Sequence, residues 1–176
     1  MTDALFRGLL TLPETRCLAV GIHMPWENNL PLQFAFWQAA QKSGLITQLR
    51  ERCGGNIVGL FCHDCDMEAR TFSYHIACEN RRFSPPGSFE ALILKPLTYA
   101  RFEGVCASPS DRFAAYERLC EAFWGQWLPG SGYISLIEPD TCACHPGYAA
   151  IERFEPEVPL SAYRLTMLFP VEKQPC

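Results

Sequence analysis

Two runs of alternating residues near the end of the chain constrain the fold more than any other feature. Residues 151–156 read Ile-Glu-Arg-Phe-Glu-Pro, and residues 163–171 read Tyr-Arg-Leu-Thr-Met-Leu-Phe-Pro-Val. Alternation with a period of two predicts β-strands, and the turn-forming residues 157–162 between the runs predict a hairpin. If the two strands pair, one carboxylate of the first strand faces the core.

The first strand of this hairpin places an acid beside an aromatic ring. Ile151 and Arg153 share one face of the strand, whereas Glu152 and Phe154 share the other. An acid next to an aromatic side chain marks either a solvated sheet edge or a site for a cation. The alternation alone leaves both interpretations open.

Composition indicates a single globular domain. The 176 residues are 48% hydrophobic and 19% charged, which suffices for a sizeable core. The net charge is −4, and the longest basic cluster is Arg81-Arg82, so we expect neither nucleic acid nor an anionic membrane as a direct partner. No apolar stretch approaches the roughly 20 residues that span a bilayer. Because residues 1–10 lack the basic leader and apolar segment of a signal peptide, we expect a cytoplasmic location.

Ten cysteines raise the question of disulfides and of a metal site. The large expected core and the missing signal peptide favour reduced thiols. Cys62-His-Asp-Cys65 and Cys142-Ala-Cys-His145 together contain enough ligands for tetrahedral zinc, but the separation of roughly 15–20 residues typical of a zinc ribbon is absent. We therefore expect exposed turn cysteines, with no metal and no cofactor. Four further cysteines are expected in the core: Cys17, Cys78, Cys106 and Cys120.

The order of predicted elements recurs in the two halves of the chain. Phe34-Ala-Phe-Trp37 of the first half matches Phe113-Ala-Ala-Tyr116 of the second. Neither half could bury both faces of its sheet alone, so we expect one domain over residues 1–176. Each half reads strand–helix–strand–strand. Repeat 1 (about 14–80) has predicted strands at 17–23, 56–62 and 70–78 and a helix that Pro31 opens. Repeat 2 (about 88–172) has predicted strands at 89–96, 97–104, 151–156 and 163–171 and a helix over 108–127.

Two segments lie outside this repeat. Residues 1–13 are expected to form a short leader with at most one helical turn. Residues 133–147 have no counterpart in the first half, and they predict an inserted loop with at most one strand of its own. A loop of this length is either a functional lid or a surface excursion.

Over residues 85–171 the chain resembles the GyrI-like small-molecule-binding domain, the effector-binding module of AraC-type and MerR-type multidrug-responsive regulators. The resemblance implies an α+β fold: a duplicated strand–helix–strand–strand module with pseudo-two-fold symmetry, whose antiparallel sheet has two long helices on one side and a ligand groove between the halves. The matching motifs are Tyr99-Ala100, Trp127-Leu-Pro-Gly-Ser-Gly-Tyr133, Glu152-Arg-Phe154 and Phe169-Pro-Val171.

This resemblance makes Glu152 the central residue of a site for cationic or amphipathic aromatic compounds. A carboxylate removed from water costs several kcal/mol unless it is paired, and a ligand cation can pair with it. Aromatic faces within about 6 Å add roughly 0.5–2 kcal/mol each. The candidate aromatic residues of the site are Trp26, Trp37, Trp124, Tyr148 and Phe154.

The resemblance leaves the role of the protein open in three ways. Regulators of this family carry an N-terminal helix-turn-helix, which the few residues before the first predicted strand cannot hold, so we expect a stand-alone binding module that sequesters a ligand or senses it for a partner. One alternative is a hydrolase of electrophilic genotoxins, in which Glu152 activates water and Tyr148 or Tyr99 donates a proton. The other is a protein-binding inhibitor, like the gyrase inhibitors that name the family.

Overall fold

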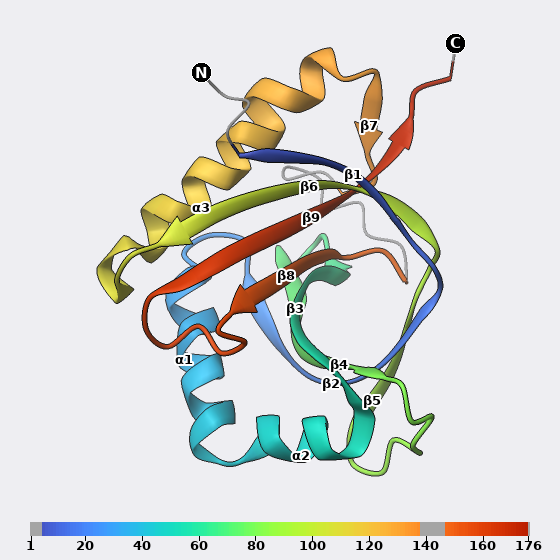
Figure 1. Cartoon of the computed structure of the whole chain (residues 1–176), viewed down its shortest axis with the longest axis vertical. Helices are drawn as coiled ribbons and strands as arrows, with labels where there is room; N and C mark the ends of the chain where they lie inside the picture. Colours follow the sequence, from blue (N-terminus) through green and yellow to red (C-terminus); the bar gives the residue numbers. More distant parts are fainter. Residues whose placement is uncertain (1–4, 138–146, 176) are drawn as a thin grey trace.

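The computed structural model describes residues 5–137 and 147–175, which form an antiparallel sheet and three α-helices (Figure 1). The α+β class expected from the sequence is confirmed. The strands are β1 (Phe6–Leu12), β2 (Thr15–Pro25), β3 (Gly54–Asp66), β4 (Thr71–Asn80), β5 (Glu90–Leu94), β6 (Leu97–Cys106), β7 (Tyr133–Ser135), β8 (Ala150–Glu155) and β9 (Tyr163–Lys173). The helices are α1 (Leu30–Lys42), α2 (Leu45–Cys53) and α3 (Arg112–Cys120), and α3 continues through a π-helical segment, Glu121–Trp127.

The sheet joins the two halves of the chain through their middle strands. Its order is β1-β6-β9-β8-β3-β4-β2-β5, and β7 pairs with β9. In the second half β6 pairs with β9 and β9 with β8, and in the first half β2 pairs with β4 and β4 with β3. The central pair is β3 with β8, in which Gly59 lies opposite Glu152. The predicted hairpin of β8 and β9 is confirmed.

The helices cover one face of the sheet. We call the apolar residues packed between this face and the helices the helix-side core. This core contains Trp37, Ala40, Ile46, Leu49, Ala115, Leu119 and Phe123 of the helices and their continuation, with Phe61, Tyr74, Ala100, Phe102, Phe154, Met167 and Phe169 of the strands. The opposite core is built from strands and loops: Cys17, Ala19, Val58, Leu60, Ala77, Leu92, Leu94, Tyr99, Ala149, Ile151 and Leu168. The alternation of β8 therefore separates its residues between two buried faces.

Glycines set the bounds of α2. Gly44 has φ of 77° and Gly54 has φ of 74°, the left-handed conformation in which glycine avoids the steric cost of a Cβ. Gly44 thus ends the first helical segment, and the residues after it form a separate helix.

No helix in the described segments combines the length and the apolar character that crossing a membrane requires.

The predicted leader is wrong, because residues 6–12 form an edge strand. Leu10 of β1 lies opposite Tyr99 of β6. Gly8 has φ of 108°, and the register shifts between Phe6 and Gly8. The burial of β1 alternates regularly along the strand, but Leu9 is exposed and apolar, so the sequence itself does not show the period of two.

The first hairpin is longer than its sequence suggests. The sequence predicts strands that end at residue 62 and begin again at residue 70, with residues 62–68 as a polar connection. In the structure β3 extends to Asp66 and β4 begins at Thr71, with a register shift between Phe61 and Cys65, so most of this connection belongs to a strand. Cys65 is disulfide-bonded, which corrects the expectation of reduced thiols throughout. Among the cysteines that the structure describes, five others are free: Cys17, Cys53, Cys78 and Cys106, which are buried, and Cys120, which is partly buried.

The predicted insertion is described only at its beginning and end. Tyr133–Ser135 forms β7 and pairs with β9, so the segment does supply a strand. The motif Cys142-Ala-Cys-His145 lies outside the described residues. Within the described residues, no group of three or more His, Cys, Asp or Glu side chains could hold a metal ion.

Candidate functional site

Strand β8 directs Glu152 into the helix-side core. Its neighbours on the same face, Ala150 and Phe154, belong to that core, whereas Ile151 belongs to the opposite core. The side chain of Glu152 is buried, with 1% of the residue exposed. Of the two interpretations of the acid–aromatic pair, a solvated sheet edge is therefore wrong.

Four buried side chains form a hydrogen-bonded group that we call the carboxylate cluster: Gln33, Trp37, Tyr74 and Glu152. The Tyr74 hydroxyl donates to Glu152 Oε2 at 2.8 Å, and Gln33 Nε2 donates to the same oxygen at 2.6 Å. Gln33 Nε2 also lies 3.0 Å from the Tyr74 oxygen, and Trp37 Nε1 donates to that oxygen at 2.8 Å. The cluster thus links α1, β4 and β8 through polar contacts inside an apolar core.

Local sequence rules explain how these residues meet. Gln33 and Trp37 are four residues apart in α1, so they lie on one face of the helix. Tyr74 and Glu152 lie on strands that flank β3, and Gly59 of β3 lies between them. A Cβ at Gly59 would come within 2.3 Å of the Tyr74 hydroxyl and 2.6 Å of Glu152 Oε2. The missing side chain at position 59 makes room for the phenol and the carboxylate to meet across β3.

Burial dominates the electrostatics of the cluster. Removal from water raises the pKa of Glu152 to about 8, although the hydrogen bonds from Tyr74 and Gln33 favour the charged form and oppose this change. The pKa of Tyr74 lies well above its usual range, first because of burial and then because of the nearby Glu152 charge. Among the residues that the structure describes, no cationic side chain forms an ion pair with Glu152. Within the described residues, the hydrogen bonds from Tyr74 and Gln33 are the contacts that stabilise its charged form.

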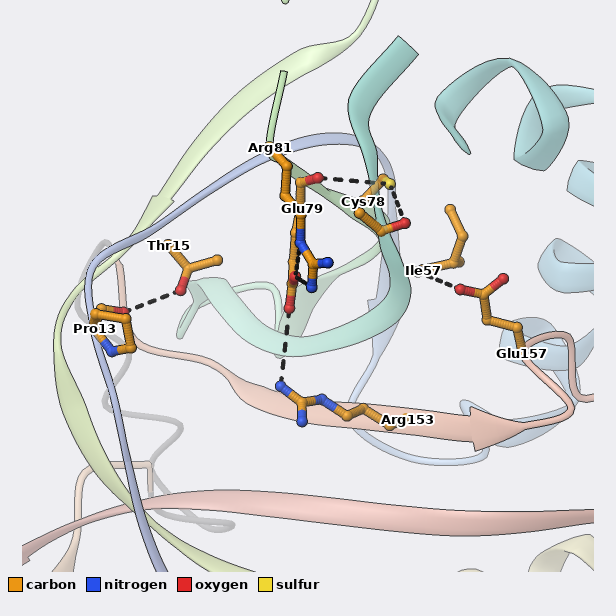
Figure 2. A network of polar contacts seen from close by, with 9 residues as sticks. Pro13, Thr15, Ile57, Cys78, Glu79, Arg81, Arg153 and Glu157 are labelled. Atoms are coloured by element: carbon orange, nitrogen blue, oxygen red, sulfur yellow. Dashed lines mark hydrogen bonds and ion pairs between the residues drawn. The ribbon is translucent and has the colours of Figure 1, made fainter. Parts of the chain in front are cut away.

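Neighbouring charges of the same segment are directed elsewhere. Figure 2 shows Arg153 extending toward Glu79, with Arg153 Nη2 3.9 Å from Glu79 Oε1. Arg81 Nη2 donates to the other Glu79 oxygen at 2.7 Å. Glu157, in the connection to β9, accepts the Ile57 backbone N–H at 2.9 Å. The cation next to Glu152 in sequence therefore lies on the other face of β8.

Aromatic rings surround the carboxylate cluster. The Trp37 ring packs edge-on against Phe154 with 5.3 Å between centroids. The Tyr74 ring packs edge-on against Phe61 at 4.8 Å and Phe36 at 6.5 Å. Such rings present both an apolar surface and a quadrupole that attracts cations.

Of the five predicted aromatic residues, Trp37 belongs to the carboxylate cluster and Phe154 packs against Trp37. The Trp26 ring lies beneath the Arg70 guanidinium, whose Cζ is 5.3 Å from the ring centroid. Trp124 packs against Phe123 with 4.6 Å between centroids and against Phe169 at 6.3 Å. Tyr148 lies beneath the Lys95 ammonium at 5.1 Å. These three residues contact other groups.

Two cluster residues, Gln33 and Tyr74, were not predicted. Gln33 is the polar member of the buried stripe of α1, and a polar side chain on such a stripe is a usable signal. Tyr99, which the sequence suggested as a proton donor, belongs to the opposite core and lies on the wrong face to reach Glu152. Tyr74 is the tyrosine whose hydroxyl contacts the carboxylate.

Comparison with known proteins shows likeness in structure and none in sequence families. No family model and no curated protein matches the chain. The protein SAV2435, solved bound to tetraphenylphosphonium, superposes with a TM-score of 0.69 and 17% identity over 95% of this chain and 93% of its own. A putative bacterial transcription regulation protein from Staphylococcus aureus MU50 gives a TM-score of 0.67 and 17% identity over 95% and 97%.

A third structure is a regulator domain. The C-terminal domain of EcmrR superposes with a TM-score of 0.53 and 14% identity over 96% of this chain and 99% of its own. All three superpositions span nearly the whole chain. Because the sequence identities are low, these superpositions show a shared fold and no more. The chain therefore has the GyrI-like fold that its sequence motifs resemble.

Proposed function

We propose that this protein binds an organic cation with an aromatic or amphipathic body, and that the carboxylate cluster is the centre of its binding site. The observation that carries the proposal is a buried Glu152 without a cationic partner among the described residues. An unpaired buried carboxylate costs free energy, which a bound cation would offset. Such a module would sequester its ligand or report it to a partner.

The position of the cluster supports a site between the two halves of the chain. Gln33, Trp37 and Tyr74 come from the first half, and Glu152 comes from the second. Because Glu152 is 1% exposed, a ligand must displace side chains to reach it. Helix α1 carries both Gln33 and Trp37, so a shift of this one helix would open the cluster. The fold also agrees, since SAV2435 was solved with an aromatic cation.

We further propose that the halves are repeats of one strand–helix–strand–strand unit related by a pseudo-two-fold axis, with boundaries near 14–80 and 88–172. The order of strand pairing supports this proposal, because β2 pairs with β4 and β4 with β3 in the first half, as β6 pairs with β9 and β9 with β8 in the second. Strands β5 and β7 are additions to this common unit. The two middle strands, β3 and β8, then meet at the centre. Glu152 lies on this central pair.

Glutamine in place of Glu152 should weaken the binding of tetraphenylphosphonium about 10- to 150-fold, because it removes the charge and keeps the shape. This loss corresponds to roughly 1.5–3 kcal/mol, the scale of a hydrogen bond to a charged group. Isothermal titration calorimetry measures it. Tetraphenylborate, which has the same shape and the opposite charge, should not bind to the wild-type protein.

The matched control is Glu155→Gln, which removes an exposed carboxylate from the same strand. This variant should bind tetraphenylphosphonium like the wild-type protein. Unchanged affinity in Glu152→Gln, or equal affinity of the wild-type protein for the cation and the anion, would contradict the proposed function.

The affinity for tetraphenylphosphonium should rise with pH and level off above about pH 8. The pKa of Glu152 in the empty site is about 8, so below this pH the carboxyl must lose a proton before it can pair with the cation. Each pH unit below 8 then lowers the affinity about tenfold, as long as the bound carboxylate stays charged. The ligand charge does not depend on pH, and the Glu152→Gln variant should show no such dependence. Titrations of the wild-type protein and of Glu152→Gln at pH 6, 7, 8 and 9 measure the two pH profiles. A flat wild-type profile would count against Glu152 as the binding group.

A further inference from the structure

When Glu152 is ionised, as it must be to pair with a cation, the donor groups of the carboxylate cluster all point at acceptors inside the cluster. The single N–H of Trp37 donates to the Tyr74 oxygen, and the single O–H of Tyr74 donates to Glu152 Oε2. The Gln33 amide nitrogen donates to Glu152 Oε2 at 2.6 Å and lies 3.0 Å from the Tyr74 oxygen. With Glu152 ionised, each donor group of the cluster therefore already has an acceptor within the cluster.

Two acceptor oxygens of the same cluster remain. Gln33 Oε1 is buried and accepts no hydrogen bond within the described part of the chain. Both hydrogen bonds to Glu152 end on Oε2, and Glu152 Oε1 accepts none from the residues that the structure describes. A buried acceptor without a donor is unfavourable, and native structures rarely leave one unless something else fills the place.

The direction of the Gln33 amide follows from its neighbours. Trp37 can only donate, so the Tyr74 oxygen accepts from it and the Tyr74 hydrogen is left for Glu152. When Glu152 is ionised, Gln33 therefore faces two acceptors, the Tyr74 oxygen and the carboxylate, and presents its nitrogen to both. Its oxygen is then turned away from them and left without a donor.

We infer that the ligand of this site is a cation that carries its own N–H donors, such as a protonated aromatic amine or an amidine. This inference rests on the proposed function and names the chemical class of ligand. Gln33 Oε1 shares its amide carbon with Nε2, which lies 2.6 Å from the carboxylate, so the two vacant acceptors belong to adjacent groups. A nitrogen with two or more hydrogens can donate to both while its charge pairs with Glu152.

A quaternary cation satisfies the charge of the site but not its hydrogen bonds. It would leave Gln33 Oε1 buried without a donor, and sites with unpaired polar groups discriminate strongly against such ligands. The rings of Trp37 and Phe154, 5.3 Å apart between centroids, would pack against the aromatic body of either ligand. Selectivity between the two cations then depends on the hydrogen bonds alone.

The test compares 4-phenylbenzylamine with its N,N,N-trimethyl derivative at pH 8 by isothermal titration calorimetry. Both are cations with one aromatic skeleton, and they differ in their N–H donors. The wild-type protein should bind the primary amine at least tenfold more tightly. In Gln33→Met, which keeps the length of the side chain and removes the acceptor, this ratio should fall about fivefold or more. Gln38→Met, an exposed position of the same helix, should leave the ratio unchanged.

The outcomes separate this inference from the proposed function. If neither cation binds, the proposed function fails. If both bind with similar affinity, or the trimethyl derivative binds more tightly, the cation site stands and the inference about N–H donors is overturned. The wild-type comparison decides this even if Gln33→Met does not fold.

Discussion

Replacing Glu152 with glutamine should stabilise the protein in alkaline solution by several kcal/mol. The pKa of this buried carboxyl is about 8 in the folded protein, against an ordinary value of 4.5. Between these two values the folded protein keeps a proton that the unfolded chain has lost, so the free energy of unfolding falls as pH rises from about 4.5 to 8. Because each pH unit in this window corresponds to about 1.4 kcal/mol, the cost of the charge reaches on the order of 3–5 kcal/mol at pH 9. Glutamine avoids this cost, since it carries no charge in either state.

Urea unfolding of both proteins at pH 5 and pH 9 measures the effect. The difference in the free energy of unfolding between Glu152→Gln and wild type should be small at pH 5 and should grow by several kcal/mol at pH 9. Groups that titrate alike in both proteins cancel in this difference. Glu155→Gln, which changes an exposed carboxyl of the same strand, should show no such growth. A difference independent of pH would mean that the Glu152 carboxyl titrates in the folded protein as it does in the unfolded chain.

A charge that destabilises its own fold is more readily explained by binding than by structure. Glutamine would keep the shape of Glu152 and its hydrogen bonds from Tyr74 and Gln33 at a lower cost. Functional sites commonly retain groups that are less stable than their alternatives. If Glu152→Gln both stabilises the protein and loses cation binding, then the same carboxylate destabilises the fold and binds the ligand.

The strand face of Glu152 was predictable because β8 alternates. A period of two assigns Glu152 and Phe154 to one face, and the structure places both in or beside the helix-side core. Trp37 was predictable from the apolar stripe of α1 for a similar reason. In each case the signal is local, since it depends on residues only two to four positions apart.

Tyr74 was not predictable from alternation, because β4 is buried on both faces. Seven consecutive residues of this strand, from Phe72 to Cys78, are buried. A strand covered on both sides shows no difference between its faces, so periodicity cannot assign Tyr74 to the face of Glu152. The contact also requires β3 to lie between β4 and β8, which is a pairing over long range. Gly59 was the one local signal of this contact, because a side chain at position 59 would clash with both the Tyr74 hydroxyl and Glu152 Oε2.

An alanine at position 59 should destabilise the protein by on the order of 2–4 kcal/mol. The new Cβ would lie 2.3 Å from the Tyr74 hydroxyl and 2.6 Å from Glu152 Oε2, well inside van der Waals contact. Tyr74 cannot retreat easily, because it is fully buried and packs against Phe61 at 4.8 Å. Overpacking of this kind costs about 1–3 kcal/mol, and the loss of the buried hydrogen bond between Tyr74 and Glu152 adds to it.

A double-mutant cycle tests whether the Tyr74 hydroxyl is the obstacle. In a Tyr74→Phe background the nearest atom is gone, so Gly59→Ala should cost about 1–2 kcal/mol less than in the wild-type protein. Gly130→Ala is the control, since its Cβ would meet no atom within 4 Å and should change stability by less than about 0.5 kcal/mol. Urea unfolding at pH 7 measures all variants. An equal cost of Gly59→Ala in both backgrounds would mean that the hydroxyl does not need the space at position 59, and the explanation of how the phenol and the carboxylate meet across β3 would fail.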